Sequence, residues 1–411
     1  MAKDSTSENF TNPQSVPACP WPLPAQGIDV LLLITVLGMV LFGLLMVYSS
    51  SFIYAQERTG DGLAFIKKQL FFSGLGLGAL LAVCRIDYRK WSKWAYPVLG
   101  VAVALLLAVF IPGLGARAGG AQRWIHLGPV GFQPGEFAKF AVIFFVAHQL
   151  DRKKERIHTF AAGVLSHVLI PLPAFLLLLL QPDFGTTVMI MSVIFMLMFI
   201  AGVPKKYLFT ALAVALVAGV VLAMGTAYRR DRVMTFLDPW RDPAGKGFQI
   251  IQSMLGLHNG SLFGVGLGNG KEKLFYLPEA HNDFIFAVIG EELGFLGVVA
   301  VVVAYLYLIY RGFKIAWNCY TQYQDLFGVL LASGITLALG LQGFVNMAVV
   351  MGLVPTKGLT LPFISYGGSA ILVDLFAVGV LLSIARGPQT AKQVTRAPAS
   401  RSPIATKSAV A

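Results

Sequence analysis

Residues 28–48 read IDVLLLITVLGMVLFGLLMVY, a run of 21 residues in which Asp29 is the only charged side chain. A helix needs about 20 predominantly apolar residues to cross the hydrocarbon core of a bilayer. The run therefore predicts a transmembrane helix close to the start of the chain.

The composition of the whole chain extends this prediction. Of its 411 residues 56% are hydrophobic and only 13% are charged, with a mean hydropathy of +0.71. Soluble domains carry roughly 25% charged residues. The net charge of +12 could indicate nucleic-acid binding, but the cations sit in short clusters between apolar runs. Membrane proteins place such clusters in their inner loops, so we expect no nucleic-acid partner.

Similar apolar runs recur along the chain, and helix is the default because open strand edges in lipid leave backbone groups unpaired. We therefore predict an all-α, polytopic integral membrane protein of about ten transmembrane helices. The membrane domain is expected at 28–386, between disordered cytoplasmic tails at 1–27 and 387–411. The expected spans are 28–48, 65–83, 95–111, 136–150, 160–180, 184–201, 207–225, 284–310, 326–353 and 367–385.

The distribution of cations predicts the orientation. Basic clusters lie in 85–93, 152–156, 205–206 and 311–314, which are alternate loops and so share one side. By the positive-inside rule that side is the cytoplasm, and both termini lie there. The segment 226–282 then forms a large extracytoplasmic loop between spans seven and eight. Its many cations point either to an anionic ligand or to lipid headgroups.

Ionisable residues within spans are costly and commonly functional. Glu136 and Lys139 lie three apart on one face of the fourth span. They form either a functional pair or a neutralising pair that only aids packing. Asp283 stands where the outer loop enters the eighth span. It is a reactive carboxylate, a cap for the free amides of that helix, or both.

Other polar features have simpler explanations. Gln342 and Asn346 are four apart on one helix face, which favours interhelical hydrogen bonds. The glycine-rich stretch GVGLGNG, 264–270, lacks the strand-to-helix context of a phosphate loop and is interpreted as a flexible loop. The histidines and the three cysteines show no metal-ligand spacing, so we assign no metal site.

Five long motifs together are similar to the SEDS family of shape, elongation, division and sporulation proteins. The resemblance covers about 28–386, with the motifs in order. Within it, IGEELG at 289–294 and PTKG at 355–358 resemble the division branch, with the sporulation branch close by. The five motifs are RWIHLGPVGFQPGEFAK (123–139), QPDFGT (181–186), DPWRDPAGKGFQIIQS (238–253), YLPEAHNDFIFAVIGEELGFLG (276–297) and GLVPTKGLTLPFISYGGSA (352–370).

The resemblance implies a peptidoglycan glycosyltransferase that polymerises lipid II, a disaccharide-pentapeptide on undecaprenyl pyrophosphate, at the division septum of the inner membrane. Asp283 matches the acidic residue that the family needs for catalysis and would be the general base. Ala370 and Asp374 depart from the family pattern at span ten. The residues expected to bind substrate are Arg123, Glu136, Lys139, Arg241, Glu279, His281, Lys357 and Ser365.

The resemblance also implies partners. These are lipid II, a cognate class B penicillin-binding transpeptidase and other membrane proteins of the division machinery. No cofactor is certain from the sequence, and a divalent cation such as magnesium could share the stabilisation of the leaving pyrophosphate.

Two other functions remain compatible with the residues. A lipid II flippase would need a polar path across the whole membrane, and Glu291, Glu292 and Asp374 keep that alternative open. A non-catalytic scaffold of the division complex would depend on lipid-facing helix surfaces more than on the outer polar cluster.

Overall fold

The computed structural model describes residues 27–118, 121–127, 130–225, 227–277, 279–356 and 358–387. Apart from residues 27 and 387, the two predicted tails lie outside this part of the chain. The elements are α1 (Val30–Thr59), α2 (Ala64–Val83), α3 (Arg89–Ala108), β1 (Gly115–Ala118), β2 (Ala121–Leu127), β3 (Val130–Phe132), α4 (Pro134–Arg152), η1 (Lys154–Arg156), η2 (Ala161–Leu165), α5 (Ser166–Leu169), α6 (Leu172–Leu180), α7 (Phe184–Ile200), α8 (Lys205–Met224), α9 (Ala227–Leu237), η3 (Pro239–Arg241), α10 (Phe248–Asn259), η4 (Glu272–Tyr276), α11 (Ile285–Tyr323), α12 (Leu326–Val350) and α13 (Gly368–Ala385).

The predicted all-α membrane architecture is confirmed. Seven helices of the described chain are long and apolar enough to cross a bilayer, and η2 and α5 together with α6 make an eighth if the bent pair is one span. The apolar helix α7 is shorter, with 17 residues. The predicted number of ten spans therefore stays a prediction.

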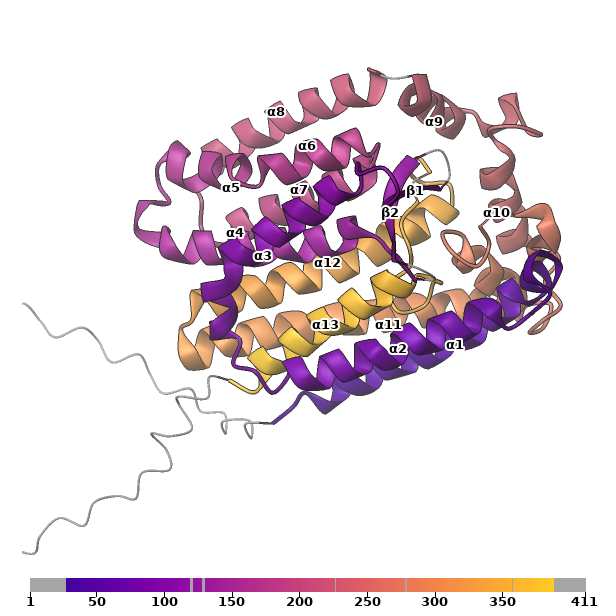
Figure 1. The fold of residues 1–411 in the computed structure, drawn as a ribbon, viewed down its shortest axis with the longest axis horizontal. Helices are drawn as coiled ribbons and strands as arrows, with labels where there is room; N and C mark the ends of the chain where they lie inside the picture. The colour runs from indigo at the N-terminus through magenta and orange to yellow at the C-terminus, as the bar shows by residue number, and fades with distance from the viewer. Residues whose placement is uncertain are drawn as a thin grey trace, which may run out of the picture.

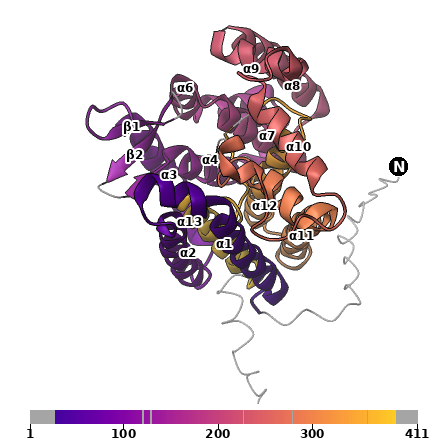
Figure 2. The same cartoon turned by 90° about the vertical axis from the view of Figure 1, so that its right-hand side faces the viewer.

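The long helices lie side by side along the long axis of the molecule (Figure 1). In the end view, α13 is enclosed by its neighbours (Figure 2), and it packs against α2, α4, α11 and α12. Within their most apolar windows α13 is 83% buried and α12 72%, whereas α8 is only 6% buried. The core of the bundle is thus built around α4, α12 and α13, and α8 lies at its periphery.

Both described ends of the chain lie at the same end of the bundle. The guanidinium of Arg311 is 2.6 Å from the carboxylate of Asp29, just before α1, and Arg386 after α13 donates a hydrogen bond to the carbonyl of Cys84. The basic clusters 85–93, 152–156, 205–206 and 311–314 also lie toward this end of the bundle. At the other end lie α9, α10 and the sheet (Figure 1). The arrangement agrees with termini that share one side of the membrane.

The predicted outer segment 112–135 contains a small sheet that the sequence did not indicate. Its strands are antiparallel in the order β1-β2-β3, with Ile125 of β2 opposite both Gly115 and Phe132. The sheet leads directly into α4. It therefore fixes the position of the first turns of α4, which contain Glu136 and Lys139.

The predicted fifth span is broken. A π-helical turn, η2, leads into α5, and α6 follows after a bend of 40° at Pro171. Proline lacks the backbone N–H that an uninterrupted helix would use, so the axis changes direction there.

A second break divides α11 near its outer end. Gly294 has φ 67° and ψ −163°, which interrupts the helical hydrogen bonds between 285–293 and 295–323. The loop 260–266 lies against this break and replaces the missing bonds. The replacements are Val265 N–H to Glu291 O (3.0 Å), Gly266 N–H to Glu292 O (3.1 Å), Phe295 N–H to Ser261 O (2.8 Å) and Leu296 N–H to Leu262 O (3.3 Å).

This docking corrects the interpretation of 264–270 as a flexible loop. Gly264 has a positive φ of 79°, and a methyl group built on it would lie 2.1 Å from the carbonyl oxygen of Glu292. Only glycine lets the two backbones approach so closely. The sequence pattern did not show this because the break that the loop repairs lies about 30 residues further along the chain.

We predict that Gly264→Ala destabilises the protein more than Gly268→Ala does. Both glycines have positive φ, so both changes carry the left-handed strain of about 1–2 kcal/mol. Nothing lies within 4 Å of a methyl group at Gly268, so the added steric cost, about 1–3 kcal/mol, applies to Gly264 alone. Thermal unfolding of the two purified variants in detergent measures the difference. Equal melting temperatures would mean that the loop does not hold the break.

Candidate functional site

Asp283 lies in the turn just before α11, at the end of the bundle that carries α9, α10 and the sheet. The helix begins at Ile285 with Phe284 as its N-cap, and no side chain accepts a capping hydrogen bond. The alternative in which Asp283 caps this helix is therefore wrong. Among the described residues its carboxylate has no hydrogen-bond partner, and the residue is only partly buried. Within the described part of the chain the carboxylate is therefore partly exposed and makes no internal hydrogen bond.

The surroundings of Asp283 shift its protonation. Burial, together with the Glu279 carboxylate, raises the pKa of Asp283 to about 7, and Arg232 and Arg123 oppose that rise. Desolvation by the packed turn outweighs the two cations, so the carboxyl group titrates near neutral pH.

The segment 354–366 lies against this carboxylate. A methyl group built on Gly358 would be 2.9 Å from Oδ2 of Asp283, so the glycine leaves room for the acid. Lys357, which precedes it and which we expected to bind substrate, lies outside the described residues.

Arg123, in the first half of β2, is held by backbone carbonyls. Its guanidinium donates to Gln181 O at 3.1 Å and to Pro182 O at 2.5 Å. These bonds join two of the motifs found in the sequence, 123–139 and 181–186. They leave Arg123 within electrostatic reach of Asp283.

Arg232 also belongs to this site, although it lies in none of the five sequence motifs. It comes from α9 and donates to the carbonyl of Thr356 at 3.0 Å, which places it beside the segment that faces Asp283. The predicted substrate-binding residues Arg241 and Glu279 are both exposed. Glu279 affects Asp283 electrostatically, whereas no ion pair of Arg241 occurs in the described part of the chain.

His281 is enclosed by aromatic rings. Its imidazole centroid lies 4.6 Å from that of Phe65, 5.3 Å from Tyr54 and 5.8 Å from Tyr366. Burial lowers the pKa of His281, and the Glu279 carboxylate partly offsets this effect. The ring therefore packs as a neutral group that supports the turn before Asp283.

Ser365 also has an internal role. Its hydroxyl oxygen accepts from the backbone N–H of Leu361 at 2.8 Å, and its carbonyl accepts from Gln69 of α2 at 3.1 Å. The residue is buried. It closes the turn 361–365 that leads into α13, and its predicted contact with substrate stays a prediction.

Lys139 is completely buried in the core of the bundle. Its ammonium donates to Glu136 at 2.7 Å, to Gln342 at 2.5 Å and to Asp374 at 3.4 Å. One cation thus faces two carboxyl groups, and the cluster is neutral only when one of these is protonated. This geometry favours the packing alternative for Glu136 and Lys139. It also explains the departure at Asp374, which contacts the lysine.

The amides of α12 are hydrogen-bonded, but only the bond between Gln342 and Lys139 of α4 joins two helices as predicted. Gln342 receives the Lys139 bond on its oxygen and donates to Thr360 O at 3.1 Å. Asn346, one turn further, donates to Leu359 O and to the carbonyl of Asp283. Their partners lie mostly in the irregular segment before α13.

The two glutamates of the IGEELG motif organise the turn η4. Glu291 accepts from the backbone N–H groups of Lys271 and Glu272 at 2.7 and 3.3 Å. Glu292 is 2.5 Å from the ammonium of Lys273.

Ser49 of α1 completes this second buried cluster. Its hydroxyl donates to Glu292, and it accepts from Lys273 at 3.1 Å. Within the described chain, the acids that kept the flippase alternative open are thus bonded internally.

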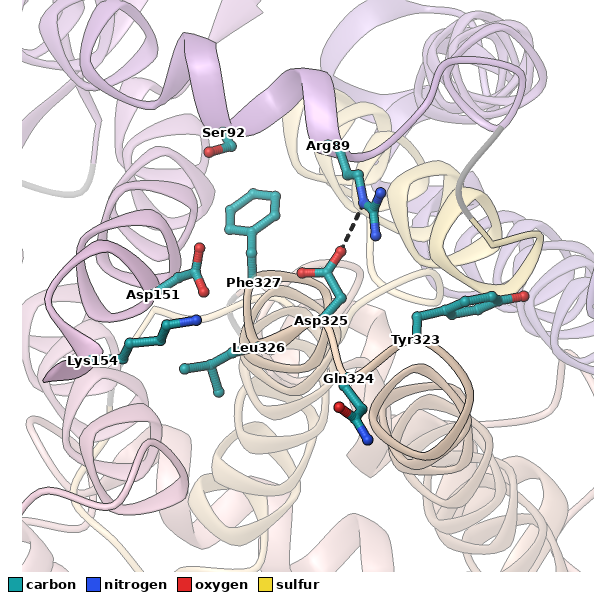
Figure 3. A pocket seen from close by; sticks show the side chains of 9 residues that line it. All are labelled: Arg89, Ser92, Asp151, Lys154, Tyr323, Gln324, Asp325, Leu326 and Phe327. Atoms are coloured by element: carbon teal, nitrogen blue, oxygen red, sulfur yellow. Dashed lines mark hydrogen bonds and ion pairs between the residues drawn. The ribbon is translucent and has the colours of Figure 1, made fainter. Parts of the chain in front are cut away.

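A separate cavity of about 400 Å³ lies at the opposite end of the bundle (Figure 3). Arg89 and Asp325 form an ion pair of 2.9 Å on one side of the cavity. Asp151 and Lys154 line another side. Neither Asp283 nor Lys139 lines this cavity. It therefore does not belong to the site at the start of α11.

The described residues contain no group of three or more histidine, cysteine or acidic side chains that could hold a metal ion. A divalent cation at this site stays a prediction, and the chemistry below runs through no metal.

The motifs that converge here are those of one family. Residues 29–390 match the cell cycle protein family of FtsW, RodA and SpoVE. The chain belongs to this family, the SEDS family that its sequence resembled.

Individual relatives are similar over most of their length. The chain is 44% identical to a probable peptidoglycan glycosyltransferase FtsW of Geobacter metallireducens over 87% of this chain and 94% of the relative. It is 40% identical to stage V sporulation protein E of Bacillus subtilis over 87% of this chain and 97% of that one.

Solved structures share the fold. A chain of a peptidoglycan synthase complex, described as coordinating polymerization and crosslinking, is 33% identical with a TM-score of 0.70, covering 87% of this chain and 98% of that one. The rod shape determining protein RodA of Thermus thermophilus is 29% identical with a TM-score of 0.65, covering 87% and 97%.

We predict that Lys139→Met lowers stability as well as activity. Removing the ammonium leaves Glu136 and Asp374 buried without their cation, a loss typically of about 3–5 kcal/mol. Adding Glu136→Gln should restore part of the melting temperature because it removes one of the stranded acids. A single variant with a normal melting temperature and no activity would instead show that Lys139 acts on the substrate.

Proposed function

We propose that this protein is a peptidoglycan glycosyltransferase that polymerises lipid II during septal wall synthesis. The single observation that carries the proposal is the Asp283 carboxylate, which is partly exposed, has no hydrogen-bond partner among the described residues and lies within electrostatic reach of Arg123 and Arg232. The names of the FtsW relatives support the activity and the septal role.

In the proposed step, Asp283 takes the proton of the acceptor sugar hydroxyl. The hydroxyl oxygen then bonds to the anomeric carbon of the donor, and the bond from that carbon to the pyrophosphate oxygen breaks. The lipid pyrophosphate leaves with the electron pair, so no general acid is needed, unlike in glycosidases with their paired carboxylates. Direct displacement inverts the anomeric carbon, as conversion of an α-linked donor into a β-linked glycan requires.

A carboxyl group with a pKa near 7 suits the role of base. A general base works best when its pKa lies near the working pH, because it is then both ionised and able to hold the proton. Arg123 and Arg232 carry the positive charge that a leaving pyrophosphate needs. The guanidinium groups are fixed by backbone carbonyls before substrate arrives.

The partner and the location belong to this proposal as well. The similar chain solved within a peptidoglycan synthase complex supports a crosslinking partner, which we expect to be a class B penicillin-binding transpeptidase. The apolar helices support a membrane location, with Asp283 on the outer side of the inner membrane.

We predict that Asp283→Asn abolishes polymerisation while the protein folds normally. The carboxylate makes no capping bond, and the amide has the same shape, so stability should change little. Loss of a general base typically lowers the rate about 100- to 10,000-fold. Glycan synthesis from lipid II by the purified variant, with its transpeptidase partner present, measures this.

The same assay separates the alternatives. A flippase or a scaffold needs no proton acceptor at this position and should tolerate the change. Glycan formation near the wild-type rate by the asparagine variant would contradict the proposed mechanism.

We predict that the polymerisation rate rises with pH through about 7. Asp283 acts as a base only when deprotonated, and with a pKa of about 7 its ionised fraction grows from about a tenth at pH 6 to about nine-tenths at pH 8. Initial rates at saturating lipid II should follow this curve and level off above it. A rate that is flat between these values would mean that another group limits the reaction.

A further inference from the structure

Asn346 connects the backbone of the Asp283 turn to the segment packed against it. Its amide nitrogen donates to the carbonyl of Asp283 at 2.8 Å and to the carbonyl of Leu359 at 2.6 Å. The side chain is 1% exposed. One buried amide therefore joins α12, the turn before α11 and the segment 358–360.

The orientation of this amide follows from its partners. Two carbonyl oxygens can both be satisfied only by the NH₂ group, so the oxygen of Asn346 must point away from them. Breaking these bonds would leave two backbone carbonyls in an irregular, buried region without a donor. Such groups are expensive in a membrane interior.

The second partner, Leu359, follows the glycine that touches the acid. Gly358 lies so close to Asp283 that a methyl group there would be 2.9 Å from its carboxylate. By holding Asp283 and Leu359 at once, the amide fixes the separation between the carboxylate and the wall it faces.

The bond network continues one helical turn back. Gln342 donates to Thr360 at 3.1 Å, and its oxygen accepts from Lys139. Positions 342 and 346 thus hold consecutive residues of the same segment. Gln342 is bonded to the buried lysine. Of these two amides, only Asn346 bonds to the Asp283 turn.

We propose that Asn346 is a positioning residue that holds Asp283 in place for proton transfer. The inference rests on the proposed function, in which Asp283 is the general base. Asn346 touches the backbone of Asp283 and acts through it. Small displacements of a catalytic group can lower the rate by about 100-fold without changing substrate affinity.

The test compares Asn346→Ala with Ser253→Ala. Ser253 of α10 is also buried and donates to the carbonyl of Val350, close to the same end of α12, but it does not contact Asp283. Both changes remove a side-chain donor to a backbone carbonyl. Melting temperature, kcat and KM for lipid II polymerisation, and the pH profile are measured for each.

For Asn346→Ala we expect kcat to fall about 10- to 100-fold, with KM within about threefold of wild type and a displaced midpoint of the pH profile. Ser253→Ala should lose a similar amount of stability and keep its kcat and pH profile. Wild-type kcat for Asn346→Ala, or equal losses of kcat in both variants, would overturn the proposal.

Asn346→Ser guards against a failure of the alanine variant to fold. Its hydroxyl retains one donor, so kcat should lie between those of wild type and alanine; a wild-type kcat overturns the proposal here too. Asp283→Asn separates this inference from the proposed function. If it is inactive while the Asn346 variants are fully active, only the positioning role fails, and if it is active, the assignment of the base itself fails.

Discussion

A bilayer offers no water to backbone groups, so every departure from a helix within this bundle must be repaired by the protein itself. The break of α11 at Gly294 is repaired by backbone bonds from the loop 260–266. The irregular segment before α13 is repaired by side chains, with Gln342 and Asn346 supplying donors and Ser365 an acceptor. These repairs lie toward the end of the bundle that carries Asp283, and they satisfy backbone groups there although much of that end is not helical.

The same constraint governs the charged groups. Lys139 is neutralised by Glu136 and Asp374, and Lys273 by Glu292, so each cation of the interior has its acid within hydrogen-bond distance. Asp283 has no cation at hydrogen-bond distance among the described residues, and it remains partly exposed. A partly exposed acid with a raised pKa, within electrostatic reach of Arg123 and Arg232, is a candidate for chemistry.

Several residues of the family motifs therefore serve the site indirectly. His281 packs between aromatic rings, and Ser365 closes a turn. Glu291 holds the backbone of η4. The motifs describe a scaffold built around one acid and two arginines, and their length reflects how many internal bonds an irregular segment needs when water cannot supply them.

The sequence by itself determined the class of protein, most of the spans and the acid at the start of α11, because apolar length and charge placement are local properties of the chain. It also indicated the interhelical bond of Gln342, whereas Asn346, on the same helix face, bonds to irregular segments instead. Only the tertiary structure showed that Asp283 makes no capping bond, that Lys139 bonds to Glu136, Gln342 and Asp374, and which loop repairs Gly294. Each of these depends on segments that are distant in sequence and meet only when the helices pack. No local sequence pattern indicates which of these segments will be in contact.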